Sequence, residues 1–335
     1  MDDPGPPART GPPASSWPTR HRVFVPVEQT LRAAGGCLLR RDLVRSRAEG
    51  RELADLVAAV TILRLGRGAY ALPTAPPDVV APRLVDGLLT CVSAAARLGL
   101  PLLDQPVAPH VAIHSSRRSP RGDLLPAGTQ MHWDGRILRS PPRSGHGRLG
   151  AAGLMVAPEL ALVHALRCLP PREVVALWDA AVNRSCVRLA DLAALRPARA
   201  GRRAFDAVLR ATDGRSQSMP ETFLRLGLRR AGLRVEPQAL VEGIGFVDLL
   251  VERRVVVEVD GYAFHSDRVA FGEDRRRDRA AVAVGLISLR FGFGDAVRTT
   301  GAVMEIDEAV RRSRIEGRPC LDDRLVAVGC APAGR

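Results

Sequence analysis

A valine-rich segment that contains two acidic residues gives the strongest indication of the fold. The run reads RVVVEVD and extends from Arg254 to Asp260. Because a β-strand places alternate side chains on opposite faces, Glu258 and Asp260 share one face. Val257 and Val259 then enter an apolar layer on the other face. An ionised side chain on so hydrophobic a strand is costly unless it is paired or bound to a metal ion, so the segment predicts a strand whose acids have partners.

The regions around this strand predict a helix, three strands, a helix, a strand and a final helix. Apolar residues recur there at helical or alternating spacing. The predicted helices cover residues 220–231, 268–284 and 297–312, and the predicted strands cover 235–241, 245–251, 254–260 and 285–291. This αβββαβα order is that of the restriction-endonuclease-like core, which we expect over residues 218–312.

A third acidic residue, Asp248, belongs to the preceding predicted strand. If the turn contains three residues, Glu252 to Arg254, it places Asp248 directly opposite Glu258. Their carboxylates are then within reach of one divalent cation. Hard oxygen ligands suit Mg²⁺ or Mn²⁺, which polarises a phosphodiester and lowers the pKa of an attacking water. Glu221, on the first helix of this domain, is placed to add a ligand or to hold a metal-bound water.

The spacing of Asp248, Glu258 and Asp260 resembles that of the PD-(D/E)XK nuclease superfamily. The chain contains no lysine, and Asp260 occupies the position of the superfamily's lysine. The sequence EVDGYAFHSD, followed by EDRRRDR and GLISLRFGF, resembles the very-short-patch-repair-like (Vsr-like) branch, in which that lysine is not retained. The resemblance implies that Asp248 and Glu258 are metal ligands and that Asp260 is a ligand or positions water.

The same resemblance implies further site residues. His265 is the candidate general base or acid, because a histidine titrates in the useful range and follows the strand closely. Arg277 and Arg290 are candidates to stabilise the charge on phosphate, the task that a lysine performs elsewhere in the superfamily. The candidate catalytic set is therefore Glu221, Asp248, Glu258, Asp260 and His265.

Arginine, which accounts for all 49 basic residues, is concentrated in three stretches of the chain, and the net charge is +13. Such a balance suits a polyanion such as DNA or RNA, although a GC-rich genome is an alternative reason for the arginines. One basic stretch, residues 20–75, predicts three short helices and a hairpin with a Gly66-Arg67-Gly68 turn, the plan of a winged helix-turn-helix. The alternative is a small helical domain with solvated arginines. The arginines expected to contact DNA are Arg40, Arg41, Arg47, Arg51, Arg64 and Arg67.

The segments GGCLLRRDLV and LRLGRGAYAL resemble the amino-terminal winged helix of AbiEi-type antitoxins of type IV toxin–antitoxin systems. That resemblance implies binding to operator DNA. The stretch SAAARLGLPLL resembles the middle part of AbiEi-like proteins. Over residues 76–200 we accordingly expect a mixed α+β region, with a helix over 84–98, strands over 110–115 and 129–133, and helices over 158–169, 172–182 and 189–195.

Histidines and cysteines show no metal-ligand spacing. The histidines of the middle region, at positions 110, 114, 132, 146 and 164, are scattered, and the six cysteines of the chain contain no CxxC pair. We therefore predict neither a zinc site nor a disulfide framework. The histidines are interpreted as structural or surface residues.

The remaining segments carry no targeting signal. Residues 1–19 are rich in Pro, Gly and Ser, which predicts a disordered arm, and residues 313–335 are expected to be a flexible tail. The start of the chain has no apolar region typical of a secretory signal, and no apolar run is long enough to span a bilayer. We expect a cytoplasmic protein with reduced thiols and no membrane partner.

Two functions follow from these patterns. The first is an α/β multidomain DNA endonuclease, dependent on Mg²⁺ or Mn²⁺, that acts in repair or in defence against foreign DNA. The second is a non-catalytic DNA-binding transcriptional regulator or antitoxin, in which the nuclease-like domain is a scaffold. RNA as a substrate and assembly into a homodimer both stay open.

Overall fold

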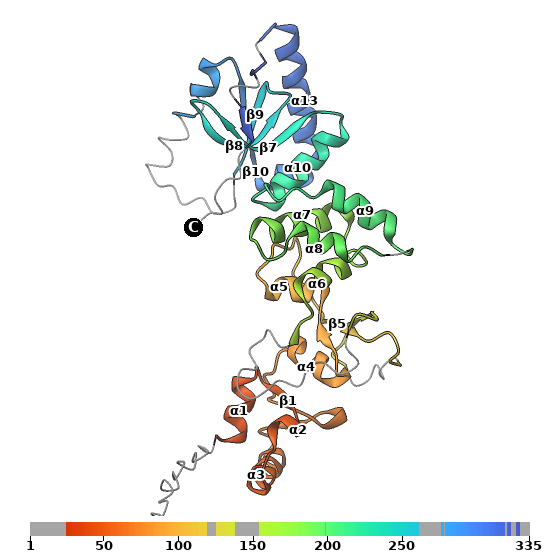
Figure 1. Cartoon of the computed structure of the whole chain (residues 1–335). Coiled ribbons are helices and arrows are strands. Elements are labelled where there is room, and N and C mark those ends of the chain that lie inside the picture. Colours follow the sequence, from red (N-terminus) through yellow and green to blue (C-terminus); the bar gives the residue numbers. More distant parts are fainter. Residues whose placement is uncertain are drawn as a thin grey trace, which may run out of the picture.

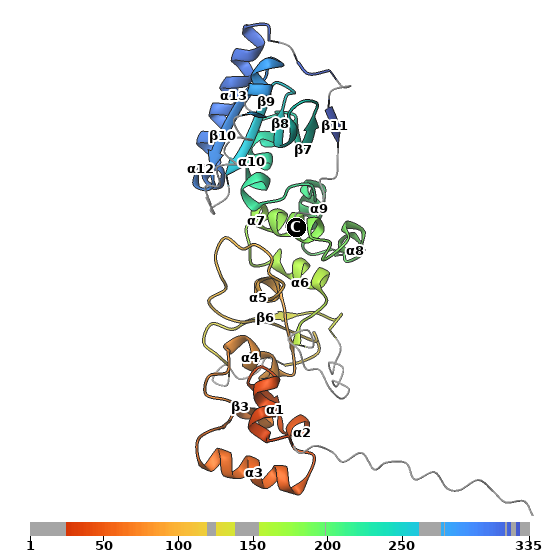
Figure 2. The same cartoon turned by 90° about the vertical axis from the view of Figure 1, so that its left-hand side faces the viewer.

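A computed structural model of the chain describes residues 25–118, 125–137, 154–197, 199–260, 276–277, 279–318, 320–322 and 326–328. The chain is of mixed α/β class, and the strands in these ranges form sheets of three, five and three strands. The molecule is elongated, with the N-terminal helices at one end, the middle helices next, and the five-stranded sheet at the other end (Figure 1, Figure 2). The expected arm, residues 1–19, lies outside the described residues.

The N-terminal unit contains the helices and the hairpin predicted for residues 20–75. A strand that was not predicted, β1, pairs with β3, so the sheet order is β1-β3-β2. Ser46 begins α3 with a capping box, in which its hydroxyl accepts from the Glu49 amide while the Glu49 carboxylate accepts from the Ser46 amide. The elements are α1 (Val27–Ala33), β1 (Cys37–Leu39), α2 (Arg40–Leu43), α3 (Arg47–Ala58), β2 (Leu63–Arg64), the 3₁₀ turn η1 (Gly66–Gly68) and β3 (Ala69–Ala71).

The middle region combines a small sheet with a group of helices. Strand β5 is antiparallel to β4 and parallel to β6, and helices α5 to α9 share a core around Trp178 and Phe205. The elements are α4 (Pro77–Val85), β4 (Leu88–Leu89), α5 (Cys91–Arg97), β5 (His110–Ile113), β6 (Gln130–Trp133), α6 (Pro158–Ala165), α7 (Pro171–Asn183), α8 (Leu189–Ala194) and α9 (Arg202–Ala211).

The continuous helix predicted over 84–98 is wrong. Helix α4 ends at Val85, because Asp86 adopts a left-handed φ of 51°, and β4 separates α4 from α5. A side chain at Gly87 would place its Cβ 2.7 Å from the carbonyl oxygen of Ala112. The break therefore lets the chain pass close to β5.

The C-terminal unit contains the five-stranded sheet. The sheet order is β10-β9-β8-β7-β11; β10 runs parallel to β9, and the other neighbours are antiparallel. Described residues 279–283 are helical, within the helix predicted over 268–284. The named elements are α10 (Met219–Arg230), β7 (Val235–Val241), β8 (Gly245–Val251), β9 (Val255–Asp260), β10 (Ile287–Gly292), α12 (Phe293–Arg298), α13 (Thr300–Ile315) and β11 (Val326–Val328).

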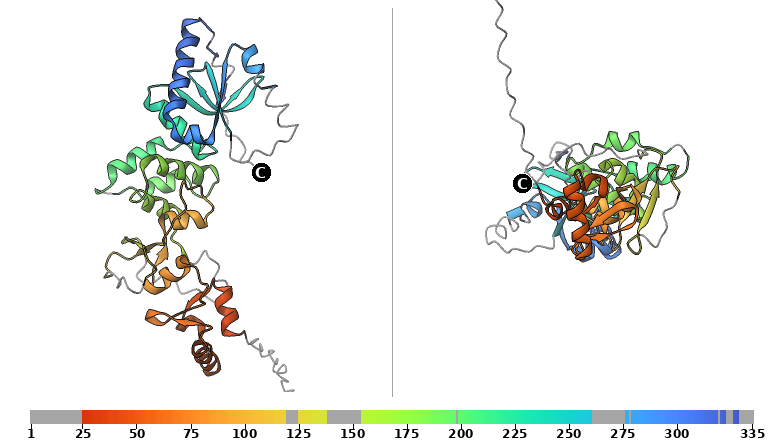
Figure 3. Two further views of the ribbon diagram at one scale, coloured as in Figure 1. Left: turned by 180° about the vertical axis from the view of Figure 1, so that it is seen from behind. Right: turned by 90° about the horizontal axis from the view of Figure 1, so that it is seen from below.

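Alternation along β9 distributes its side chains between two hydrophobic cores. Val257, with Val259 at its edge, packs with residues of α10 and α13 on one face of the sheet. Val256 packs on the other face with Ala281 and Leu286. The predicted apolar layer on the Val257 face is therefore present, with α10 and α13 covering it (Figure 1, Figure 3).

Two boundaries near the C-terminus differ from the predictions. The predicted helix over 297–312 is divided at Thr299, whose φ is 66°, into α12 and α13. The segment 313–335 was expected to be a flexible tail, but α13 continues to Ile315 and Val326–Val328 pairs with β7 as an edge strand. Three valine and alanine residues are too short a signal to identify a strand whose stability comes from its pairing.

A buried ion pair joins the middle helices to the C-terminal unit. Arg225 of α10 donates to Asp179 of α7 over 2.6 Å, and the two side chains are 0% and 1% exposed. Thr222 and the amide of Asp213 also donate to Asp179. Arg225 donates to the carbonyl oxygen of Ala211 at the end of α9. These contacts fix α7, α9 and α10 against one another.

Candidate functional site

Polar side chains form a row across four strands of the large sheet. Leu249 pairs with Val257, so the next position along the two strands places Asp248 opposite Glu258, as the three-residue turn predicts. Glu258 is in turn the register partner of Arg290 on β10. On the other side of Asp248, the register pairs of β7 and β8 that come directly before and after Gln238 show that Gln238 lies opposite Asp248.

Gln238 connects Asp248 to a third acidic residue. Its side-chain amide donates to Asp248 Oδ1 over 3.2 Å and to Glu221 Oε2 over 3.1 Å. Glu221 is in the first turn of α10, where it also accepts from the amide of Gln217. The backbone φ of Gln238 is 49°, a left-handed value that is uncommon for a residue with a side chain and that often marks functional sites.

The acidic cluster holds its protons unusually tightly. Burial and the charge of Asp248 raise the pKa of Glu221 to about 7. The same two causes raise the pKa of Glu258 to about 8, although Arg277 opposes them. Burial also raises the pKa of Asp248. Glu221 is buried, Asp248 and Glu258 are half-buried, and the negative charges of the three carboxylates would repel one another. A bound cation can relieve this repulsion in place of protons.

Two arginines supply positive charge next to the cluster. Arg277 donates to Glu258 Oε1 over 2.6 Å and also bonds the carbonyl oxygen of Phe246. Arg290 lies 3.4 Å from Asp260. Both predicted phosphate-stabilising arginines are therefore engaged with predicted catalytic acids.

The predicted catalytic residues are only partly brought together. Glu221, Asp248 and Glu258 form one cluster with Gln238, whereas the described contact of Asp260 is with Arg290 at the end of β9. His265 lies outside the described residues. Gln238 is a site residue that the sequence patterns missed; its register position opposite Asp248 was the available signal.

The cluster has the chemistry of a site for a hard divalent cation. Glu221, Asp248 and Glu258 offer oxygen atoms from two strands and a helix, the donor set that Mg²⁺ or Mn²⁺ requires. The amide of Gln238 orients two of the three carboxyl groups. The neighbouring Arg277 and Arg290 can face an anion that enters above the sheet.

Five of the six arginines predicted to contact DNA have described side chains, and all five are exposed on the N-terminal unit. Arg41 pairs with Asp86 over 3.5 Å. Among the described residues, no ion pair is found for Arg40, Arg47, Arg51 or Arg64. The side chain of Arg67 lies outside the described part of the chain. The five arginines with described, exposed side chains are Arg40, Arg41, Arg47, Arg51 and Arg64.

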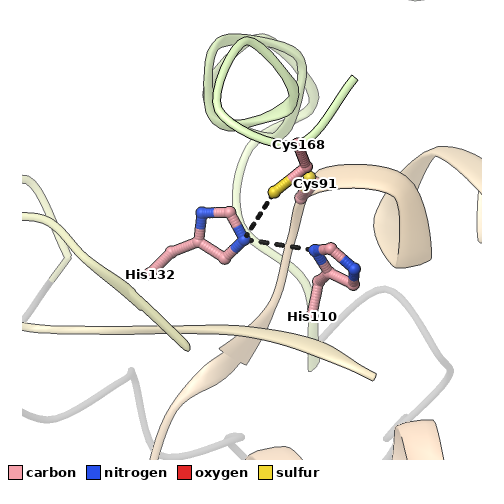
Figure 4. Close-up of side chains that lie close together, drawn as sticks. All are labelled: Cys91, His110, His132 and Cys168. Atoms are coloured by element: carbon pink, nitrogen blue, oxygen red, sulfur yellow. Dashed lines mark hydrogen bonds between the residues drawn. The ribbon is translucent and has the colours of Figure 1, made fainter. Parts of the chain in front are cut away.

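A second cluster, of cysteine and histidine, was not predicted. Cys91, His110, His132 and Cys168 place one ligand atom each within 4.8 Å of the others, although their positions along the sequence show no metal-ligand spacing (Figure 4). Burial and the nearby His164 lower the pKa of His132 to about 3. A hydrogen bond with Cys91 lowers the pKa of Cys168 to about 7. Such soft ligands do not suit Mg²⁺.

Comparison with models of protein families finds no match for this chain, and comparison with curated proteins finds none either. Among the described residues, no helix is long and apolar enough to cross a membrane. The site geometry therefore carries the functional conclusion.

Proposed function

We propose that the chain is a metal-dependent DNA endonuclease whose C-terminal unit hydrolyses a phosphodiester bond. The observation that carries the proposal is the cluster of Glu221, Asp248 and Glu258, in which Gln238 bridges Glu221 and Asp248 while Asp248 lies opposite Glu258. A buried acidic cluster with raised pKa values is expected at a functional site rather than in a core that serves stability alone.

The arrangement of the sheet supports the same proposal. One helix, three antiparallel strands, a helical segment and a strand parallel to the third follow in the order αβββαβ. The resemblance to Vsr-like nucleases leads one to expect this order, with the acids on the second and third strands. Asp248 and Glu258 occupy those two strands.

The roles of the residues follow from their positions. Glu221, Asp248 and Glu258 would hold Mg²⁺ or Mn²⁺, which when bound supplies charge neutralisation at the phosphate and an acidified water. Gln238 orients Asp248 and Glu221. Arg277 and Arg290 offer guanidinium groups to the non-bridging phosphate oxygens, and the surface arginines of the N-terminal unit hold the DNA backbone.

The proposal is tested with supercoiled plasmid and the full chain in Mg²⁺ or Mn²⁺. We expect nicking that falls at least about a hundredfold in Glu258→Ala, because the metal contribution is worth several kcal/mol. The matched control is Glu305→Ala, which removes an exposed carboxylate on α13 and should cut like the wild type. Equal cleavage by Glu258→Ala and the wild type would show that the assignment is wrong. RNA and mismatched DNA complete the substrate panel.

One observation favours a second function, a DNA-binding regulator or antitoxin without catalysis. Arg277 already contacts Glu258 Oε1 over 2.6 Å, a partner that a purely structural acidic site would retain. Under this function, every nucleic acid stays intact with Mg²⁺ and with Mn²⁺, while a gel shift on the chain's own promoter succeeds. Calorimetry then detects no binding of Mn²⁺ that depends on Glu258.

A further inference from the structure

The Cys/His cluster gathers four metal-binding side chains from four separate elements. Cys91 begins α5, His110 begins β5, His132 lies on β6, and Cys168 lies in the turn after α6. Nδ1 of His110 is 3.2 Å from Nε2 of His132, and Sγ of Cys168 is 3.8 Å from the same nitrogen. Figure 4 shows the four side chains pointing toward a common centre.

These separations fit a tetrahedral ion. Bonds of about 2.3 Å to sulfur and about 2.0 Å to nitrogen place two nitrogens about 3.3 Å apart, a nitrogen and a sulfur about 3.6 Å apart, and two sulfurs about 3.8 Å apart. The observed 3.2 Å and 3.8 Å differ from the corresponding values by about 0.2 Å or less. All pairs of ligand atoms lie within 4.8 Å.

We propose that Cys91, His110, His132 and Cys168 form a structural zinc site in the middle region. Two thiolates and two imidazoles are the ligand set typical of Zn²⁺, and here their ligand atoms all lie within 4.8 Å of one another. All four positions are supplied by the protein, so the site is closed and structural rather than catalytic. The proposal is independent of the acidic cluster and of the nuclease proposal.

The packing of two parallel strands brings the histidines together. Ala112 is the register partner of His132, and His110 lies two positions before Ala112 on the same strand. Because side chains two positions apart point to the same side of a strand, both histidines reach the same face of the sheet. Cys91 adopts a left-handed φ of 54°, and that conformation turns the chain from β4 into α5 next to this face.

His164 supports the cluster without joining it. Its ring stacks on His132 with centroids 5.1 Å apart and an angle of 17°. Both of its nitrogens are engaged, Nδ1 by the Thr90 hydroxyl over 2.8 Å and Nε2 by Asp134 over 2.9 Å. The ring therefore fixes the orientation of His132, and the ligand set stays at four.

The first measurement is the metal content of the untagged full chain, purified under reducing conditions from zinc-containing medium. We expect about one zinc ion per chain, because a closed site takes one ion. Cys168→Ser removes an exposed ligand and should fold, yet it should lose most of the zinc. Cys186→Ser, an exposed cysteine outside the cluster, is the matched control and should keep the zinc. Glu258→Ala should also keep it.

Cobalt distinguishes the ligand set if a variant folds poorly. Co²⁺ in the wild-type chain should give the intense visible bands of tetrahedral coordination and a near-ultraviolet thiolate-to-cobalt band. Cys168→Ser should reduce the thiolate band by about half, since one of two thiolates is lost. Full zinc content with an unchanged cobalt spectrum in Cys168→Ser would overturn the proposal. So would wild-type protein that takes up no zinc after reduction, or that contains a Cys91–Cys168 disulfide in place of the metal.

Discussion

Glu258 is the central residue of the acidic cluster in the C-terminal unit. It is mostly buried, its pKa is raised to about 8, and it contacts Arg277 on one side while Asp248 faces it on the other. The 2.6 Å ion pair with Arg277 does not restore an ordinary pKa, because burial and the charge of Asp248 together outweigh it. The negative charge that Arg277 does not balance must therefore be balanced by a second cation or by a proton.

This balance predicts how stability depends on pH without metal. Glu221 and Glu258 have pKa values raised from 4.5 to about 7 and about 8, so the folded chain binds more protons than the unfolded chain above pH 4.5. The two groups make their full contribution to the stability of the folded chain below about pH 4.5, and this contribution is lost as the pH rises to about 8. In Glu258→Gln the side chain is uncharged at every pH. In EDTA, the variant should therefore have a higher free energy of unfolding than the wild type at pH 8. At pH 5 the difference in unfolding free energy should be smaller.

Urea unfolding at the two pH values measures this difference. Each pKa unit corresponds to about 1.4 kcal/mol, so a gain of one to a few kcal/mol at pH 8 is expected. Glu305→Gln, exposed on α13, is the control and should follow the wild type at both pH values. A constant difference between Glu258→Gln and the wild type at both pH values would contradict the raised pKa.

At the scale of elements, helix α3 has a capped N-terminus and an exposed basic face. The capping box of Ser46 and Glu49 satisfies amide groups at its beginning, and Leu53 anchors the helix in the core. Arg47 and Arg51 stay exposed. Under the proposed DNA contact, stability and binding thus depend on different residues of one helix, and single substitutions can separate them.

The first of these substitutions is Arg51→Ala. We expect weaker DNA binding, measured by fluorescence anisotropy at several salt concentrations, and a salt slope lower by about one if the arginine contacts a phosphate. The unfolding midpoint should not change. The matched control is Arg188→Ala, which removes an arginine that directly precedes α8 and has an 82% exposed side chain; it should leave both affinity and slope unchanged.

The second substitution is Ser46→Ala. It removes the cap of α3 and should cost about 1 kcal/mol of unfolding free energy, because the amide of Glu49 loses its acceptor. Thermal unfolding followed by circular dichroism measures the loss. DNA affinity at a temperature where the chain stays folded should match the wild type. A variant with unaltered stability would show that the cap does not contribute.

At the scale of the whole molecule, the pair of Asp179 and Arg225 is a fully buried polar connection between the middle helices and the C-terminal unit. Burial raises the pKa of Asp179 to about 6 in spite of Arg225 and its other donors. The pair thus gains little net energy over an apolar contact, but each partner makes the burial of the other tolerable.

Asp179→Ala tests this connection. It leaves a buried guanidinium without its partner, so urea unfolding should report a loss of about 3–5 kcal/mol. Asp206→Ala breaks the more exposed Arg196–Asp206 pair nearby and should cost about 1 kcal/mol or less. If the two variants lose the same amount, the buried pair does not hold the units together. Replacing both partners by Leu and Met should recover most of the loss.

Local patterns in the sequence predict the central strands of the C-terminal unit and the pairing of its acids. The valine-rich run identifies β9, and the turn at Glu252 to Arg254 sets the register that places Asp248 opposite Glu258. Both signals are local: side-chain direction repeats every two residues, and turn length acts over a few residues. The same locality explains why most helices were predicted with errors only at their ends.

Contacts between residues that are distant in the sequence are seen only in the folded chain. His132 is separated by 22 residues from His110 and by 36 from Cys168, and the pairing of β5 with β6 and the packing of α6 bring the three together. Gln238 likewise joins the acidic cluster through strand pairing, and β11 exists because β7 offers it an edge. Such contacts depend on how elements pack, which no periodicity within one segment records.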